Sequence, residues 1–325
     1  MTTNNEPRTT NHELYDIVII GGGPAGFTAG IYTARARMKT LLFESLSVMG
    51  QAAMTETIEN YPGVEKASGF GLVESFKKQA ESFGLKTLQD TVHSLCPCKE
   101  GGRDAWKVAA DSGEYKALSV IVASGASPKK LGIPGESEFL GKGVSYCATC
   151  DGPFFRAKTV VVIGGGDTAV EEALFLTKFA AKVILIHRKD RLRAAKVIQE
   201  RAFACEKLSF IMDSVVLAIK GSASVSSVDI RNLRTGEVSS IECSGVFVFV
   251  GWSPNTGLLE DIVSKDPSGA VLVDGRMMSS SPGIFAAGDC TSKILHQVVT
   301  ACGDGAVAAY AAGQYVDELK GVAYK

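Results

Sequence analysis

Residues 16–26 have the sequence DIVIIGGGPAG, an apolar run that ends in a cluster of glycines. The run has the length of a buried strand, and the small residues that follow it through Ala36 are typical of a helix packed closely on a strand. The glycines fit the pattern G-x-G-x-x-G/A, in which a tight turn brings backbone close to a pyrophosphate at a helix N-terminus. The stretch therefore predicts a strand, a phosphate-binding turn and a helix.

A second copy of this pattern lies in the middle of the chain. Residues 160–169 have the sequence VVVIGGGDTA, and a helix is expected to follow to about Phe179. One glycine turn is a weak indication, because such turns also occur where no nucleotide binds. Two copies, each between a strand and a helix, indicate two Rossmann-like nucleotide-binding units in an α/β protein. The candidate nucleotide contacts are Gly21, Gly23, Pro24, Ala25 and Gly26 in the first turn and Gly164, Gly166, Asp167 and Thr168 in the second.

The residue that closes the second strand differs between the two units. At the same spacing after its first glycine, the first unit has Glu44 and the second has His187. A carboxylate at this place accepts hydrogen bonds from ribose hydroxyls and repels a 2′-phosphate, so the first unit is expected to bind FAD or NAD(H). His187 instead begins a basic run, residues 187–193, whose cations can hold the 2′-phosphate of NADPH.

The basic run has a simpler explanation as a solvated helix start. Its place at the ribose end of a nucleotide fold favours phosphate binding instead. We expect Arg188 and Arg193 to contact the phosphate beside His187, while Lys189 and Arg191 can either contact phosphate or point to solvent.

A cysteine pair, Cys147 and Cys150, lies just before the second unit in the sequence CATCD. C-x-x-C is consistent with a redox disulfide, with half of a zinc site or with two ordinary buried thiols. A structural zinc needs four ligands, but the chain has no second C-x-x-C and no H-x-x-x-H, and Cys96 and Cys98 have a poor chelate spacing. The neighbouring nucleotide unit favours the redox role, and no metal is expected.

Asp151 directly follows the cysteine pair. Disulfide exchange needs a thiolate as nucleophile and a proton for the thiolate that leaves. A neighbouring carboxyl group can carry that proton, so Asp151 is the candidate general acid and base. A helix cap or a turn residue is the alternative role.

Composition excludes several other classes of protein. A chain of 325 residues exceeds the usual size of a single core, so two domains are expected. The 46% hydrophobic and 21% charged residues are typical of a globular protein, and a net charge of −1 argues against nucleic-acid binding. Apolar runs of strand length predict no membrane span, and the polar N-terminus lacks the features of a secretory signal. We therefore expect a cytoplasmic protein.

Five motifs together, GGGPAG, CATCD, GGGDTA, HRKDRLRA and GIFAAGDC, resemble those of the low-molecular-weight thioredoxin reductases. The resemblance covers about residues 15–319, and the order of the motifs matters, because the glutathione reductase branch carries its cysteine pair beside the FAD unit. It implies a homodimer in which an NADPH-binding domain is inserted into an FAD-binding domain. We place the FAD domain at residues 1–129 and 257–325 and the NADPH domain at residues 130–256.

The resemblance also assigns roles to individual residues. It implies that Cys150 faces the flavin and that Cys147 attacks thioredoxin. Lys189 stands where the family commonly has arginine, which keeps the charge but gives up a bidentate donor. The positions that match flavin contacts of the family are Gly50, Gln51, Asn60, Gly125, Gly288, Asp289, His296, Gln297 and Val298. Of these, Asp289 has an alternative role as a turn residue after a strand.

The expected reaction is the reduction of thioredoxin by NADPH. A hydride would pass to FAD, the electrons would open the Cys147–Cys150 disulfide, and the dithiol would reduce thioredoxin by exchange. Because the nicotinamide and the cysteines share one domain but must both reach the flavin, a hinge rotation of that domain is expected. The alternatives are NADH or ferredoxin as donor, a peroxiredoxin-type acceptor, or a non-catalytic flavin redox sensor.

Overall fold

Strand β1 (Thr9–Ile20) contains the first predicted strand and lies inside the largest sheet of the protein. In the computed structural model, which describes residues 9–45 and 50–323, its side chains alternate between two cores. Ile17 and Ile19 are buried in the core that contains the long helices, and Val18 and Ile20 are buried in the core on the opposite face. Burial of both faces explains why this part of the strand is continuously apolar.

The chain divides into two units, Met1–Ser127 with Ser253–Lys325 (unit 1) and Pro128–Trp252 (unit 2). The sheet of unit 1 has the order β3-β2-β1-β6-β5-β4, and β17 pairs with β6 outside this path. Strand β1 is parallel to β2 and β6, whereas β5 is antiparallel to its neighbours. The further strands of unit 1 are β2 (Thr40–Glu44), β3 (Lys86–Gln89), β4 (Val92–Glu100), β5 (Arg103–Ala110), β6 (Gly113–Val122) and β17 (Ile284–Ala286).

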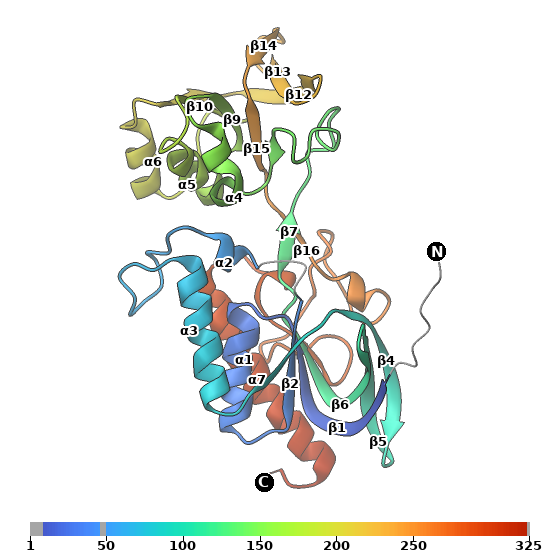
Figure 1. Ribbon diagram of the computed structural model, residues 1–325. Helices are drawn as coiled ribbons and strands as arrows, with labels where there is room; N and C mark the ends of the chain where they lie inside the picture. Colours follow the sequence, from blue (N-terminus) through green and yellow to red (C-terminus); the bar gives the residue numbers. More distant parts are fainter. Residues whose placement is uncertain (1–8, 46–49, 324–325) are drawn as a thin grey trace. The chain divides into compact units, whose positions relative to one another are not determined.

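Three long helices lie side by side on one face of this sheet (Figure 1): α1 (Pro24–Arg35), α3 (Gly69–Ser82) and α7 (Val298–Lys320). Helix α1 contacts both of the others, and the short α2 (Gln51–Met54) contacts α3. Two 3-10 turns, η2 (Gly257–Leu259) and η3 (Gly288–Cys290), complete unit 1. Because β17 and α7 come from the C-terminal segment, both ends of the chain build the same core.

Unit 2 repeats the arrangement of unit 1 around the second glycine turn. Its parallel sheet has the order β11-β10-β9-β15-β8, which gives β9 (Thr159–Gly164) the place that β1 has in unit 1. Val160 and Val162 face a core with α5 (Asp167–Leu176) and α6 (Lys196–Phe203). Val161 and Ile163 face a second core that a three-stranded antiparallel sheet, β12-β13-β14, closes. The predicted α/β fold with two Rossmann-like units is confirmed.

The remaining elements of unit 2 are short. They are β8 (Val144–Ser145), α4 (Ala148–Asp151), η1 (Gly152–Phe155), β10 (Lys182–Ile186), β11 (Leu208–Ile211), β12 (Ser214–Gly221), β13 (Val225–Asn232), β14 (Val238–Glu242) and β15 (Gly245–Phe249). Helix α5 ends at Leu176, earlier than the predicted end near Phe179. The Thr177 hydroxyl donates to the Leu174 carbonyl at 2.6 Å, and such a local bond competes with continuation of the helix.

Two crossings join the units, at β7 (Ala126–Pro128) and β16 (Trp252–Pro254), which pair with each other. Asn255 N–H donates to the Gly125 carbonyl at 3.0 Å within unit 1, and Lys129 N–H donates to the Gly251 carbonyl at 2.9 Å within unit 2. The chain therefore returns to unit 1 slightly before residue 257, because Asn255 is already bonded there. Among the described residues, no helix is long and apolar enough to cross a membrane.

Candidate functional site

The two cysteines of the C-x-x-C sequence form a disulfide, with their Cα atoms 5.4 Å apart. Cys147 is the N-cap of α4, and its Sγ accepts the Cys150 N–H at 3.2 Å. Cys150 is exposed and Cys147 is half-buried, so the pair is not two ordinary buried thiols. Within residues 9–45 and 50–323, no group of three His, Cys, Asp or Glu side chains is arranged to hold a metal.

Ser145 fixes the backbone that leads into the disulfide. Its Oγ accepts the Cys147 N–H at 3.0 Å and donates to the Cys147 carbonyl at 3.1 Å. Next to it, the Tyr146 hydroxyl donates to Glu136 at 2.7 Å, and burial, together with this bond, raises the tyrosine pKa. Glu136 is only 2% exposed and also accepts two backbone N–H groups. This support cannot be predicted from the cysteine motif, because Glu136 and its backbone partners lie in a separate loop.

Asp151 lines a pocket of about 350 Å³ in unit 2. Its N–H donates to the Cys147 carbonyl at 3.2 Å, so the carboxyl group is attached to the same short helix as the disulfide. Ser145, Lys142 and Lys158 line the same pocket. Asp151 therefore lies on the same short helix as the disulfide and shares its pocket with two lysines, and its role as a proton carrier stays a prediction.

The glycine turn of unit 1 has the geometry of a nucleotide-binding turn. Gly21 has a φ of +118°, and a Cβ there would lie 2.2 Å from the Ala123 carbonyl oxygen. Gly23 is the N-cap of α1, where no described side chain forms a capping hydrogen bond, and the space around its missing Cβ is open. An uncapped helix N-terminus beside open space leaves N–H groups for an anion.

Unit 2 repeats this turn with a different ribose-end residue. Gly164 has a φ of +154°, and a Cβ there would lie 2.3 Å from the Phe249 carbonyl oxygen. A Cβ at Gly165 would lie 2.3 Å from His187 Nδ1, just as one at Gly22 would lie 2.8 Å from Glu44 Cγ. Glu44 and His187 therefore occupy corresponding places, as their spacing predicts.

Arg193 of the basic run also lies against the second turn. Its N–H donates to the Gly165 carbonyl at 2.7 Å, and its Nη2 lies 3.5 Å from the position of a Cβ on Gly166. Arg188, Lys189 and Arg193 are all exposed, whereas burial, aided by Arg188, lowers the pKa of His187.

Asp167 and Thr168 form the first turn of α5, directly after the glycine turn. The Asp167 Oδ1 accepts the Ala195 N–H at 2.6 Å. The structure thus uses Asp167 to fix the segment that follows the basic run, a role that the sequence analysis did not predict.

Glu44 has a partner that the sequence analysis missed. Lys77 of α3 donates from Nζ to Glu44 Oε2 at 2.7 Å, and this bond raises the lysine pKa. The pair is largely buried, with side-chain exposures of 20% and 25%. Lys77 lies 33 residues after Glu44, and a lysine on a helix gives no signal of such a contact.

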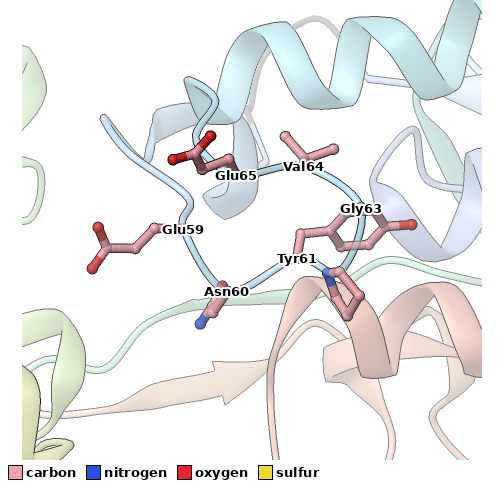
Figure 2. A pocket seen from close by; sticks show the side chains of 7 residues that line it. Glu59, Asn60, Tyr61, Gly63, Val64 and Glu65 are labelled. Carbon is pink, nitrogen blue, oxygen red and sulfur yellow. The ribbon is translucent and has the colours of Figure 1, made fainter.

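Several of the predicted flavin contacts lie together in unit 1. Gln51 Nε2 donates to the Ala126 carbonyl at 2.6 Å, next to Gly125, whose φ is +66°. Asn60 Nδ2 donates to Gln297 Oε1 at 3.1 Å, which joins a loop to the N-cap of α7. Figure 2 shows the loop of residues 59–65 curving around a pocket of about 580 Å³. The other predicted contacts here are Gly50, the N-cap of α2, His296, which is exposed, and Val298, the first residue of α7.

Gly288 and Asp289 lie in η3, close to the first glycine turn. A Cβ at Gly288 would lie 3.0 Å from Ala25 Cβ, and burial raises the pKa of Asp289. The Gly288 N–H donates to Asp304 Oδ2 at 3.0 Å, and Asp304 forms an ion pair with Lys293. Neither residue of this pair was predicted, because each lies outside the motif and they meet only when α7 packs.

The comparisons with known proteins agree over most of the chain. The family model described as pyridine nucleotide-disulphide oxidoreductase matches residues 15–305. The thioredoxin reductase of Peptoclostridium litorale is 49% identical, with 94% of this chain and 98% of the relative covered. The bifunctional thioredoxin reductase/thioredoxin of Mycobacterium leprae is 42% identical over 98% of this chain and 69% of its own. A crystal structure of Lactococcus lactis thioredoxin reductase, 46% identical, matches with a TM-score of 0.90 over 94% of this chain and 99% of that one.

Proposed function

This chain belongs to the pyridine nucleotide-disulphide oxidoreductase family as a thioredoxin reductase, and from that membership we propose that it uses FAD and NADPH. When bound, these groups supply a hydride and carry two electrons to a disulfide. The observation that carries the proposal is the contrast between Glu44 and His187 at corresponding places of two nucleotide turns.

The residues of both turns fit a dinucleotide. Gly23 and Gly166 are N-caps without a capping hydrogen bond from a described side chain, and each begins a helix whose first N–H groups can bind phosphate. In unit 1, Glu44 would accept ribose hydroxyls while Lys77 balances its charge. In unit 2, Arg193 is near the turn and would bind a 2′-phosphate together with Arg188.

Exchange with thioredoxin follows from the cysteine pair. After the disulfide is reduced, the Cys147 thiolate attacks one sulfur of the thioredoxin disulfide, and the other thioredoxin sulfur leaves and takes a proton. Cys150 then attacks the Cys147 sulfur, which releases dithiol thioredoxin and restores the Cys147–Cys150 disulfide. Asp151 lies on the same short helix and is the proposed carrier of the proton.

A steady-state assay with NADPH and NADH in turn tests donor and acceptor together. Arg188→Ala and Arg193→Ala should each lower kcat/KM for NADPH by about tenfold, because each removes a charge-assisted bond to phosphate, and should change the value for NADH little. Arg234→Ala, which removes an exposed arginine on the β13–β14 hairpin of the same unit, is the matched control. Equal losses with NADPH and NADH would contradict the assignment of unit 2.

The acceptor is tested with thioredoxin and with a peroxiredoxin-type protein. Thioredoxin is supported by the named relatives, one of which carries both activities in its name. Anaerobic bleaching of bound flavin by NADPH separates an enzyme from a passive redox sensor. If ferredoxin is the donor instead, NADPH will not bleach the flavin. We also propose a homodimer, as the family resemblance implies, and light scattering of the purified protein measures its oligomeric state. A cytoplasmic location stays a prediction.

A further inference from the structure

Thr149 lies between the two cysteines, and its side chain is directed at one of them. Its Oγ1 is 3.3 Å from Cys147 Sγ. A disulfide sulfur carries no hydrogen, so the threonine hydroxyl is the donor in this contact. Together with the Cys150 N–H at 3.2 Å, the Cys147 sulfur therefore has two hydrogen-bond donors.

Both donors become more important when the disulfide opens. A disulfide sulfur is a weak acceptor, whereas a thiolate is charged and strengthens every hydrogen bond that it accepts. The Cys150 N–H belongs to the backbone of α4 and is present whatever the side chains are. The Thr149 hydroxyl belongs to a side chain, so a substitution at this position removes it.

The charged side chains around α4 are mostly carboxylates, which do not stabilise a Cys147 thiolate as a hydrogen-bond donor does. Its own charged side chain is Asp151, and the helix packed against it, α5, carries only carboxylates. The 3-10 turn η1 that follows α4 has no charged residue. The pocket that Asp151 lines also has two lysines in its wall. The groups concerned are Asp167, Glu171 and Glu172 on α5 and Lys142 and Lys158 at the pocket.

We propose that Thr149 is a catalytic residue, whose hydroxyl stabilises the Cys147 thiolate during exchange. Ser145 has a different part, because it bonds the Cys147 backbone rather than its sulfur and so positions the residue. This inference rests on the proposed function, in which Cys147 attacks thioredoxin. In that step the Cys147 sulfur forms a bond to one thioredoxin sulfur as the thioredoxin S–S bond breaks, and the departing sulfur is protonated.

The test measures the Cys147 thiolate directly. In the full-length Cys150→Ser protein, the rate of Cys147 alkylation by iodoacetamide is followed against pH. Adding Thr149→Val, which keeps the shape but removes the hydroxyl, should raise the midpoint of this profile by about one pH unit. Adding Thr149→Ser instead should leave the midpoint close to its starting value.

Two controls separate the sulfur contact from a loss of structure. In the Cys147→Ser background, Thr149→Val should leave the alkylation midpoint of Cys150 in place, because the hydroxyl contacts the other sulfur. Thr235→Val, at a turn where the hydroxyl accepts the Glu237 N–H, should not move the Cys147 midpoint. An unchanged Cys147 midpoint in Thr149→Val, or an equal shift in Thr149→Ser, would overturn the proposal.

A turnover measurement distinguishes failure of this inference from failure of the proposed function. With Cys147 and Cys150 intact, Thr149→Val should lower kcat/KM for thioredoxin by about tenfold at pH 7, and raising the pH should restore most of it. If the Cys147 midpoint shifts but thioredoxin turnover does not, the thiolate role of Thr149 stands and the assignment of Cys147 as the attacking thiol is wrong.

Discussion

Gly21 shows how one residue can control a whole nucleotide site. Its φ of +118° belongs to a region that L side chains rarely adopt, and a Cβ would lie 2.2 Å from a backbone oxygen that cannot move aside cheaply. Gly23, only two residues later, has an ordinary extended backbone and open space around it. The first glycine is thus required by packing, and the second leaves room for a ligand.

Gly21→Ala should lower the free energy of unfolding by more than about 2 kcal/mol, because it adds backbone strain and a clash. Urea unfolding of the protein without cofactors measures the change. Gly23→Ala is the matched control: it should alter this stability by less than about 1 kcal/mol and weaken flavin retention instead. Similar stabilities for the two variants would show that the turn tolerates a side chain at Gly21.

At this scale, the sequence predicts the parts of the site that are local. The glycines and the ribose-end residues Glu44 and His187 follow from spacing within one unit of strand, turn, helix and second strand. Lys77, Glu136 and the Lys293–Asp304 pair do not, because each contact joins segments that only the fold brings together. The roles of the predicted residues toward a cofactor stay predictions.

Helices α1 and α7 approach each other at glycine rather than at a larger side chain. A Cβ at Gly305 would lie 2.2 Å from the Ala25 carbonyl oxygen. The two helices can therefore approach this closely only because residue 305 has no side chain. Ala25 belongs to the first glycine turn, and Gly288 lies against it as well. The close contact therefore sets the distance between α7, η3 and the N-terminus of α1.

Gly305→Ala should lower the free energy of unfolding by about 1–3 kcal/mol, since α7 must move away from α1. It should also reduce the flavin content of purified protein. Gly303→Ala lies on the exposed side of the same helix with open space around it and should be neutral or stabilising by up to about 1 kcal/mol. Thermal unfolding and flavin absorbance measure both effects, and equal losses would contradict a contact-specific cause.

Elements with a strong local pattern were predicted well, and those set by distant partners were not. Strands β1 and β9 and helices α1 and α5 follow from apolar runs that end in glycine. Strand β6 pairs with β5 along its first half and with β17 along its second, and nothing in its own residues indicates two different partners. The three-stranded sheet of unit 2 likewise depends on pairing between segments.

The whole molecule consists of one unit inserted into another. Unit 2 has its own two cores, and its ends are held together by the bond from Lys129 N–H to the Gly251 carbonyl. Unit 1 has two further cores, one of which contains side chains from α1 and α7 alike. Each unit is therefore complete in itself, although only unit 2 is continuous in sequence.

Expressed alone, residues 128–252 should fold cooperatively and form the Cys147–Cys150 disulfide, because their apolar faces are covered within the unit. Residues 1–127 alone should stay largely unfolded, since the helix-side core of unit 1 lacks α7. Circular dichroism and urea titration of the two fragments measure this contrast. A well-folded 1–127 fragment would show that α7 contributes little to that core.

The late arrival of β17 and α7 has a consequence for biosynthesis. The ribosome delivers β1, α1 and β6 first, but two of the elements that cover them, β17 and α7, are translated only after the whole of unit 2 has emerged. The apolar surface of the nascent N-terminal segment that α7 and β17 later cover therefore stays exposed to solvent while the inserted unit is translated and folds. The inserted unit can thus be completed before the unit in which the chain begins. Premature termination anywhere before α7 would release a chain whose helix-side core lacks that helix.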